Sequence, residues 1–226
     1  HAIARVQSLI NLSGLHYVVD IDIKGFFDNI NHTILMKQLW NMGIQDRKVL
    51  RLIGKMLKAE IDGEGIPMKG TPQGGIISPL LSNIVLNDLD QWVAGQWENF
   101  ETTRKYSQNK AKYSALKKTN LKEGYIVRYA DDFKIICRDS DTAYKWYHSI
   151  RLYLKARLKL DISLEKSKVI NLRKKQSEFL GFTIKAVPKK NKRVANTGIV
   201  AKKKLQLKEK YRELIKKIQK SPTAEN

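Results

Sequence analysis

Three aspartates stand where the chain could bind divalent cations. Asp131 and Asp132 are adjacent, and both flanks of the pair, within residues 125–137, are rich in β-branched and aromatic residues, as in a β-hairpin. Aspartate is common in turns, so the pair alone would carry little information. Asp22, however, stands in a third segment of this kind, where strand alternation puts it on the same face as Asp20. Because unpaired carboxylates are costly to bury, we interpret Asp22, Asp131 and Asp132 as a cation-binding cluster.

Phosphoryl transfer is the chemistry that such a cluster serves. Mg²⁺ takes oxygen ligands in octahedral geometry, typically one or two carboxylates plus substrate phosphates. Two Mg²⁺ ions about 4 Å apart can activate an attacking 3′-hydroxyl and stabilise a leaving pyrophosphate. The predicted ligands are Asp22, Asp131 and Asp132, with the Ile23 carbonyl as a further oxygen. Without metal, three close like charges would repel one another and raise the pKa of at least one carboxyl group.

Five sequence motifs stand in the order in which reverse transcriptases carry them. They span residues 22–28, 70–83, 129–132, 164–168 and 179–182, and the second is similar to the Pro-Gln-Gly motif of prokaryotic members. One short acidic motif could arise by chance, but an ordered set of five is highly specific. The sequence therefore resembles the reverse transcriptase family, and within it the group II intron reverse transcriptases, or maturases.

The order of the predicted elements indicates an α+β fold, with an antiparallel sheet backed by helices. The resemblance implies the palm of a right-hand polymerase, with partial fingers and a truncated helical thumb. We expect residues 1–200 to form the palm with residual fingers elements, and residues 201–226 to begin the thumb. Such a fold alone leaves function open, because related palms serve nucleotide cyclases and DNA-templated polymerases.

Local signals predict two helix starts and one insert. Asn31 or Thr33 can cap a helix, and Ser78 is a cap candidate followed by Pro79 at the first helical position. Residues 94–122 form a polar and basic insert, which composition favours as a solvated loop. RNA contact is the alternative for this insert, because lysines hold phosphates and its tyrosines could stack on bases.

The resemblance assigns nucleotide-binding roles to three further residues. Phe27, five residues after Asp22, stands at the steric-gate position, where a rigid ring would crowd a ribose 2′-hydroxyl and select dNTPs. The other interpretation is that Phe26 or Phe27 is simply core. Gln73 is implied to lie against the nucleotide and template, while Gly74 allows close backbone approach.

Two later motifs carry roles in proton transfer and primer binding. Lys166 or Lys168 could approach the triphosphate and protonate the departing pyrophosphate, and we favour Lys166. By resemblance, Phe179, Leu180 and Gly181 form the primer grip, although Phe179 and Leu180 could equally serve sheet packing.

The net charge of +21, from 43 Lys plus Arg against 22 Asp plus Glu, favours a nucleic-acid partner. An anionic membrane is the competing partner, but the sequence has no apolar run near 18 residues. Residues 189–220 carry thirteen Lys or Arg and two Glu, so this end holds +11 of the total charge. The predicted RNA-binding residues here are Lys189, Lys190, Lys192, Arg193, Lys202, Lys203 and Lys204. The single Cys137 excludes an internal disulfide, and the four His lack zinc-ligand spacing.

The leading hypothesis is an RNA-directed DNA polymerase of a group II intron that uses two Mg²⁺ ions. Its implied partners are intron RNA, an RNA template, a DNA primer and dNTPs, in a bacterial cytoplasmic ribonucleoprotein; a homodimer stays open. The alternative is an RNA-binding splicing maturase or scaffold with little polymerase activity. A retron or diversity-generating reverse transcriptase is a third candidate. Because the chain starts at His1 and lacks much of the fingers and thumb, we expect it to polymerise weakly on its own.

Overall fold

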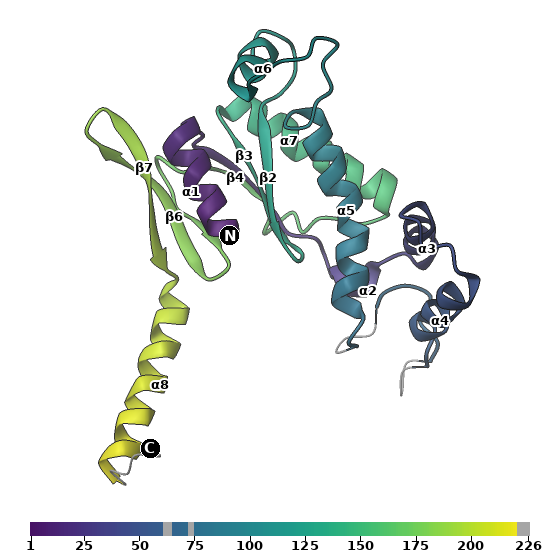
Figure 1. Cartoon of the computed structure of the whole chain (residues 1–226). Coiled ribbons are helices and arrows are strands. Elements are labelled where there is room, and N and C mark those ends of the chain that lie inside the picture. The colour runs from purple at the N-terminus through teal and green to yellow at the C-terminus, as the bar shows by residue number, and fades with distance from the viewer. Residues whose placement is uncertain (61–64, 72–74, 221–226) are drawn as a thin grey trace.

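A four-stranded antiparallel sheet forms the centre of the computed structural model, which describes residues 1–60, 65–71 and 75–220. Its strands lie in the order β2-β3-β1-β4. They are β1 (Tyr17–Ile21), β2 (Gly124–Tyr129), β3 (Asp132–Cys137) and β4 (Lys168–Asn171). This sheet and the helices around it confirm the predicted α+β fold (Figure 1).

Helices cover one face of the sheet. Alternate residues of β1 and β3, such as Val19, Ile21, Phe133 and Ile135, are buried in one core with apolar residues of these helices. The helices that pack on the sheet are α5 (Ser78–Gln96) and α7 (Ser140–Tyr153), and α7 continues into a π-helical turn, η1 (Leu154–Leu158). Helix α3 (His32–Asn41) packs against α5 and α4 (Arg47–Leu57), and the short α2 (Phe26–Asn29) precedes α3.

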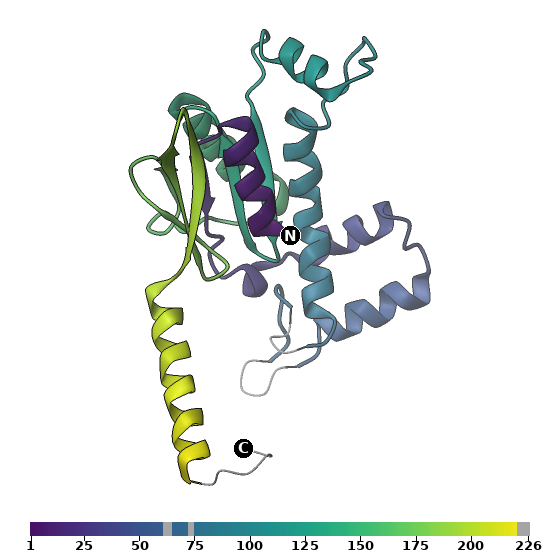
Figure 2. The same cartoon turned by 60° about the vertical axis from the view of Figure 1, so that its left-hand side comes forward.

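A second layer covers the opposite face. It consists of α1 (Ala2–Ser13) and a three-stranded sheet of β5 (Ser177–Phe179), β6 (Phe182–Lys189) and β7 (Lys192–Ile199). Figure 2 shows α1 beside this sheet. The Ala195 amide of β7 donates to Asn11 Oδ1 at 2.7 Å, and Val18 and Ile136 of the central sheet join the core of this layer.

The insert is anchored to the protein by aromatic packing. Trp97 is fully buried and its Nε1–H donates to the Tyr125 hydroxyl of β2 at 3.0 Å. Tyr113, in α6 (Asn109–Leu116), stacks on Trp97 with ring centroids 6.1 Å apart. The Tyr113 ring is therefore occupied by packing, whereas most of the insert's lysines remain exposed to solvent.

One predicted helix start is confirmed and one is wrong. Asn31 caps α3, because its side chain accepts a hydrogen bond from the Ile34 amide at 3.0 Å. Ser78 is not a cap: Ile77 holds the cap position of α5, and Ser78 is already in its first turn. Here the Ser78 amide donates to the Gly75 carbonyl at 3.1 Å, and the side chain of the cap residue Ile77 makes no capping hydrogen bond.

The last helix, α8 (Ala201–Lys220), extends away from the sheets (Figures 1 and 2). It begins where the sequence predicts the thumb to start, and that domain assignment remains a prediction. Its apolar stripe, including Leu207, Tyr211 and Leu214, is exposed. Within the described ranges, none of the helices combines the length and apolar content that crossing a bilayer requires.

Candidate active site

The acidic pair lies at the turn of the β2–β3 hairpin. Tyr129 pairs with Asp132, so Ala130 and Asp131 alone make the connection. Ala130 adopts φ 55°, a left-handed conformation that L-residues seldom take. Asp131 is exposed at the tip, whereas Asp132 is half-buried at the start of β3. The turn therefore presents one carboxylate to solvent and holds the other against the protein.

Strand register brings Asp22 to the same end of the sheet. Ile21, the last residue of β1, pairs with Phe133, so extending this register by one residue sets Asp22 opposite Asp132. Directly opposed residues of antiparallel strands share a face. The backbone of Asp22 is fixed by the loop before β4, since its amide donates to Ser167 Oγ at 3.1 Å and its carbonyl accepts from the Ser163 amide at 2.8 Å.

The three aspartates do not form a ready-made metal cage. In the described part of the chain, no three His, Cys, Asp or Glu side chains lie close enough to hold a metal ion. Asp22 Oδ2 instead lies 3.6 Å from Lys166 Nζ; the Lys166 side chain is largely exposed and the Asp22 side chain about half exposed. Carboxylate oxygens are ligands that a hard cation prefers. Separating the solvent-accessible ion pair of Asp22 and Lys166 costs little free energy. The three aspartates therefore fit Mg²⁺ once their side chains rotate. The two metal ions and the Ile23 carbonyl ligand remain predictions.

Partial burial raises the pKa of the Asp132 carboxyl, and the nearby Asp20 and Asp131 carboxylates raise it further. Lys134 and a hydrogen bond from the Leu180 backbone oppose this rise. Burial is the largest of these effects, so an ionised Asp132 is costly until a cation shares its charge.

Asp132→Asn is expected to stabilise the metal-free protein at pH 7. A raised folded-state pKa means that ionised Asp132 costs folding free energy above that pKa, and the cost vanishes below the unfolded-state pKa, where both states are protonated. The difference in melting temperature between the variant and the unmodified protein should therefore shrink as the pH falls towards 4. A constant difference across this range would contradict the assigned burial.

A lysine is buried beneath the acidic turn. Lys134, only 1% exposed, pairs with Asp20 Oδ1 at 2.7 Å and lies 5.2 Å from the centre of the Phe179 ring. It occupies β3 directly opposite Asp20 of β1. Sequence reasoning missed this residue, although a lysine inside the apolar run after Asp132 was the available signal.

Arg128 ties the turn to helix α5. Its Nη1 donates to the Ala130 carbonyl at 2.8 Å and to Asn83 Oδ1 at 2.8 Å, while its Nε donates to Asp90 at 2.9 Å. These hydrogen bonds hold the strained turn against α5 and fix the position of the carboxylates of Asp131 and Asp132. Arg128 is thus a positioning residue that the sequence did not single out.

The structure separates the two phenylalanines. Phe26 is buried in the core, whereas Phe27 is half-buried, with ring centroids 5.3 Å apart. The Phe27 carbonyl accepts from the Thr71 amide at 2.8 Å, which joins the first motif to the start of the second. Gln73 and Gly74 lie outside the described residues.

The predicted primer-grip residues form the β5–β6 turn. Phe179 is buried, and Leu180 and Gly181 both adopt positive φ, of 52° and 76°. This geometry suits a two-residue hairpin turn. The Leu180 backbone bonds to the Asp132 carboxylate, so this turn lies against the acidic one. Phe179 and Leu180 serve packing here, and their contact with a primer remains a prediction.

The seven predicted RNA-binding residues fall into two groups. Four of them lie at the tip of the β6–β7 hairpin: Lys189, Lys190, Lys192 and Arg193. The other three, Lys202, Lys203 and Lys204, lie in the first turn of α8, which follows the opposite end of the hairpin. Lys203 lies over the Phe182 ring at 5.4 Å, close to the primer-grip turn. A continuous basic segment in the sequence is therefore two separate surfaces in space.

The fold and its acidic turn define a polymerase palm. Apo telomerase from Candida tropicalis superposes with a TM-score of 0.56 at 14% identity, over 81% of this chain and 34% of that one. The family described as reverse transcriptase (RNA-dependent DNA polymerase) matches residues 1–184. The chain belongs to the reverse transcriptase family.

Curated relatives confirm the resemblance to the group II intron branch. Group II intron-encoded protein LtrA of Lactococcus lactis subsp. cremoris is 33% identical over 85% of this chain and 38% of its own length. Protein YkfC of Escherichia coli is 30% identical over 75% of this chain and 48% of its own length. The chain thus spans less than half the length of these relatives.

Proposed function

We propose that the chain carries the catalytic palm of an RNA-directed DNA polymerase encoded by a group II intron. The observation that carries the proposal is the register that sets Asp22 opposite Asp132 at the Asp131 turn. Bound Mg²⁺ would activate the primer 3′-hydroxyl and neutralise the leaving pyrophosphate, with Asp22, Asp131 and Asp132 as its ligands.

The protein's own side chains then position the substrates and move a proton. Lys166, 3.6 Å from Asp22, would donate a proton to the leaving pyrophosphate as the new phosphodiester bond forms. Lys134 would help keep Asp132 ionised, and the Leu180 turn would hold the primer end beside it.

The proposed partners are intron RNA, an RNA template, a DNA primer and dNTPs, and the basic groups on the β6–β7 hairpin and α8 would bind RNA phosphates. The second candidate function is an RNA-binding maturase with little polymerase activity. The two basic groups favour RNA binding under either function. Burial of the Asp132 carboxyl group favours catalysis, since a protein that only binds RNA gains nothing from a partly buried carboxylate.

Primer extension on an RNA template separates the two functions. The full protein should incorporate dNTPs only with Mg²⁺ present, and Asp131→Ala should abolish incorporation. Splicing of the intron RNA without any primer extension would instead establish the binding maturase.

Phe27→Ala is expected to raise the ratio of rNTP to dNTP incorporation. Loss of steric rejection worth about 1–3 kcal/mol would change the ratio by roughly 10- to 100-fold. Single-nucleotide incorporation assays measure this ratio, and Phe27→Tyr, which retains the ring, should preserve dNTP selection. An unchanged ratio in the alanine variant would remove the steric-gate assignment.

A further inference from the structure

Two backbone hydrogen bonds join the helix that carries Phe27 to the segment of residues 69–71. The Thr71 amide donates to the Phe27 carbonyl at 2.8 Å, and the Gly70 amide donates to the Ile30 carbonyl at 2.7 Å. Phe27 lies in α2, which is four residues long. A helix of one turn is not stable by itself, so the position of α2 depends on what binds it from outside.

Gly70 allows this segment to lie directly against α2. Its φ is +91°, a conformation that side chains other than glycine's rarely permit, and a Cβ here would lie 3.0 Å from the Asp28 carbonyl oxygen. Glycine is also the residue whose backbone rotates most freely. The peptide that follows Gly70 therefore needs a partner to keep its orientation.

The imidazole of His32 is that partner. His32 is the first residue of α3, it is half-buried, and its Nε2 lies 2.7 Å from the Gly70 carbonyl oxygen. A carbonyl accepts hydrogen bonds and does not donate them, so Nε2 carries the proton. The Gly70 carbonyl and the Thr71 amide belong to one planar trans peptide and point in opposite directions. His32 thus holds one side of the peptide whose other side holds Phe27.

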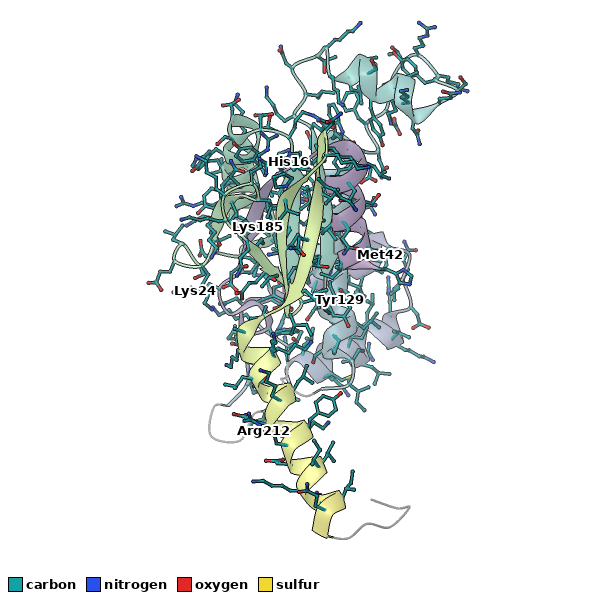
Figure 3. The ribbon with its side chains drawn as sticks, turned by 90° about the vertical axis from the view of Figure 1, so that its left-hand side faces the viewer. His16, Lys24, Met42, Tyr129, Lys185 and Arg212 are labelled. Carbon is teal, nitrogen blue, oxygen red and sulfur yellow. The ribbon has the colours of Figure 1, made fainter. Side chains whose placement is uncertain are left out.

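This network lies at the same end of the strands as the acidic turn. Asn29, the last residue of α2, donates from Nδ2 to the Lys24 carbonyl at 3.1 Å and accepts from Lys69 Nζ at 2.6 Å. Figure 3 shows Lys24 at the level of Tyr129, and His16 at the other end of the strands. A change at the 69–71 segment would therefore displace Phe27 relative to the acidic turn.

We propose that His32 is a positioning residue for sugar selection. Its hydrogen bond to the peptide between Gly70 and Thr71 holds Phe27 where the ring rejects a ribose 2′-hydroxyl. The proposal rests on the polymerase function and the steric-gate role proposed above, and it gives that gate a support from a separate helix. In this role His32 contacts neither nucleotide nor metal, so it affects the choice between dNTP and rNTP and leaves the chemical step unchanged.

The ratio of rNTP to dNTP incorporation by the full protein tests this role. His32→Ala should raise the ratio by about 2- to 10-fold, the range that loss of one ordinary hydrogen bond allows. A variant that only folds less well lowers both rates together and keeps their ratio. His32→Gln, whose side-chain amide can donate to the same carbonyl, should retain the parent ratio. The matched control is His148→Ala, which removes an exposed histidine of α7. A parent-like ratio in His32→Ala would overturn the proposal.

A double variant tests whether His32 acts through Phe27. Phe27→Ala with His32→Ala should give the ratio of Phe27→Ala alone, since a ring that is absent cannot be displaced. A ratio that multiplies the two single effects would mean that His32 acts independently of the gate, and this result would contradict the proposal.

Amide hydrogen exchange measures the same link without nucleotide incorporation. The Thr71 amide should exchange about 2- to 10-fold faster in His32→Ala and at the parent rate in His32→Gln. The Ile135 amide of the central sheet should stay unchanged in both. An unchanged Thr71 rate in His32→Ala would overturn the link, even in protein that extends no primer. Absence of dNTP incorporation by the parent protein is instead a failure of the polymerase proposal.

Discussion

Asp131→Ala is expected to lower the rate of primer extension on an RNA template by at least about 10³-fold. A metal ion contributes several kcal/mol to charge stabilisation in such a transition state, and each 1.36 kcal/mol corresponds to a factor of ten. Asp131 is exposed at the tip of a two-residue turn, so its removal should cost little packing. The loss should therefore be catalytic and leave the fold intact.

Single-turnover extension across a Mg²⁺ titration measures this effect. The matched control is Asp141→Ala, which removes an exposed carboxylate that pairs with Lys145 on α7, away from the turn. The control should extend primers at the unmodified rate, and both variants should melt within a degree or two of the parent protein. A rate for Asp131→Ala within tenfold of the parent would show that this carboxylate does not hold a catalytic metal.

The hairpin and its acids could be predicted from the sequence because both signals are local. Alternation and β-branched flanks define the two strands, and the adjacent aspartates fill the short connection between them. The sequence does not decide which of Phe26 and Phe27 is buried in the core and which is half-exposed, since a short helical turn accommodates either ring in either place. Only packing against the sheet decides between them.

The positioning contacts could not be predicted because they join distant parts of the chain. Arg128 and Asp90 are 38 residues apart, and Lys134 and Asp20 are 114 residues apart. A lysine or arginine in a strand ordinarily indicates a solvated face, so both the pairing of Lys134 with Asp20 and the burial of Lys134 are visible only in the folded structure. The same limit applies to the basic segment of residues 189–204, which the β6–β7 hairpin folds into two separate surfaces.

Asp20→Asn is expected to lower the free energy of unfolding by about 3 kcal/mol. Removing one partner of a buried ion pair costs roughly 3–5 kcal/mol, because the remaining charge is buried without compensation. The Lys134 side chain is 2% exposed, so solvent cannot replace the lost carboxylate. The lower end of the range applies because Asp132 also lies near Lys134 and would compensate part of that charge.

Urea unfolding of a double-mutant cycle separates the pair from the packing around it. Asp20→Asn with Lys134→Met should recover most of the loss, since an apolar side chain of similar length replaces the buried charge. A double variant that unfolds as readily as Asp20→Asn alone would indicate that packing, and not the unpaired charge, carries the cost. Lys134→Met should also raise the Asp132 pKa further, because Lys134 now lowers it. The pH at which primer extension reaches half its maximum should therefore rise in that variant, which connects a buried strand pair to the chemistry at the turn.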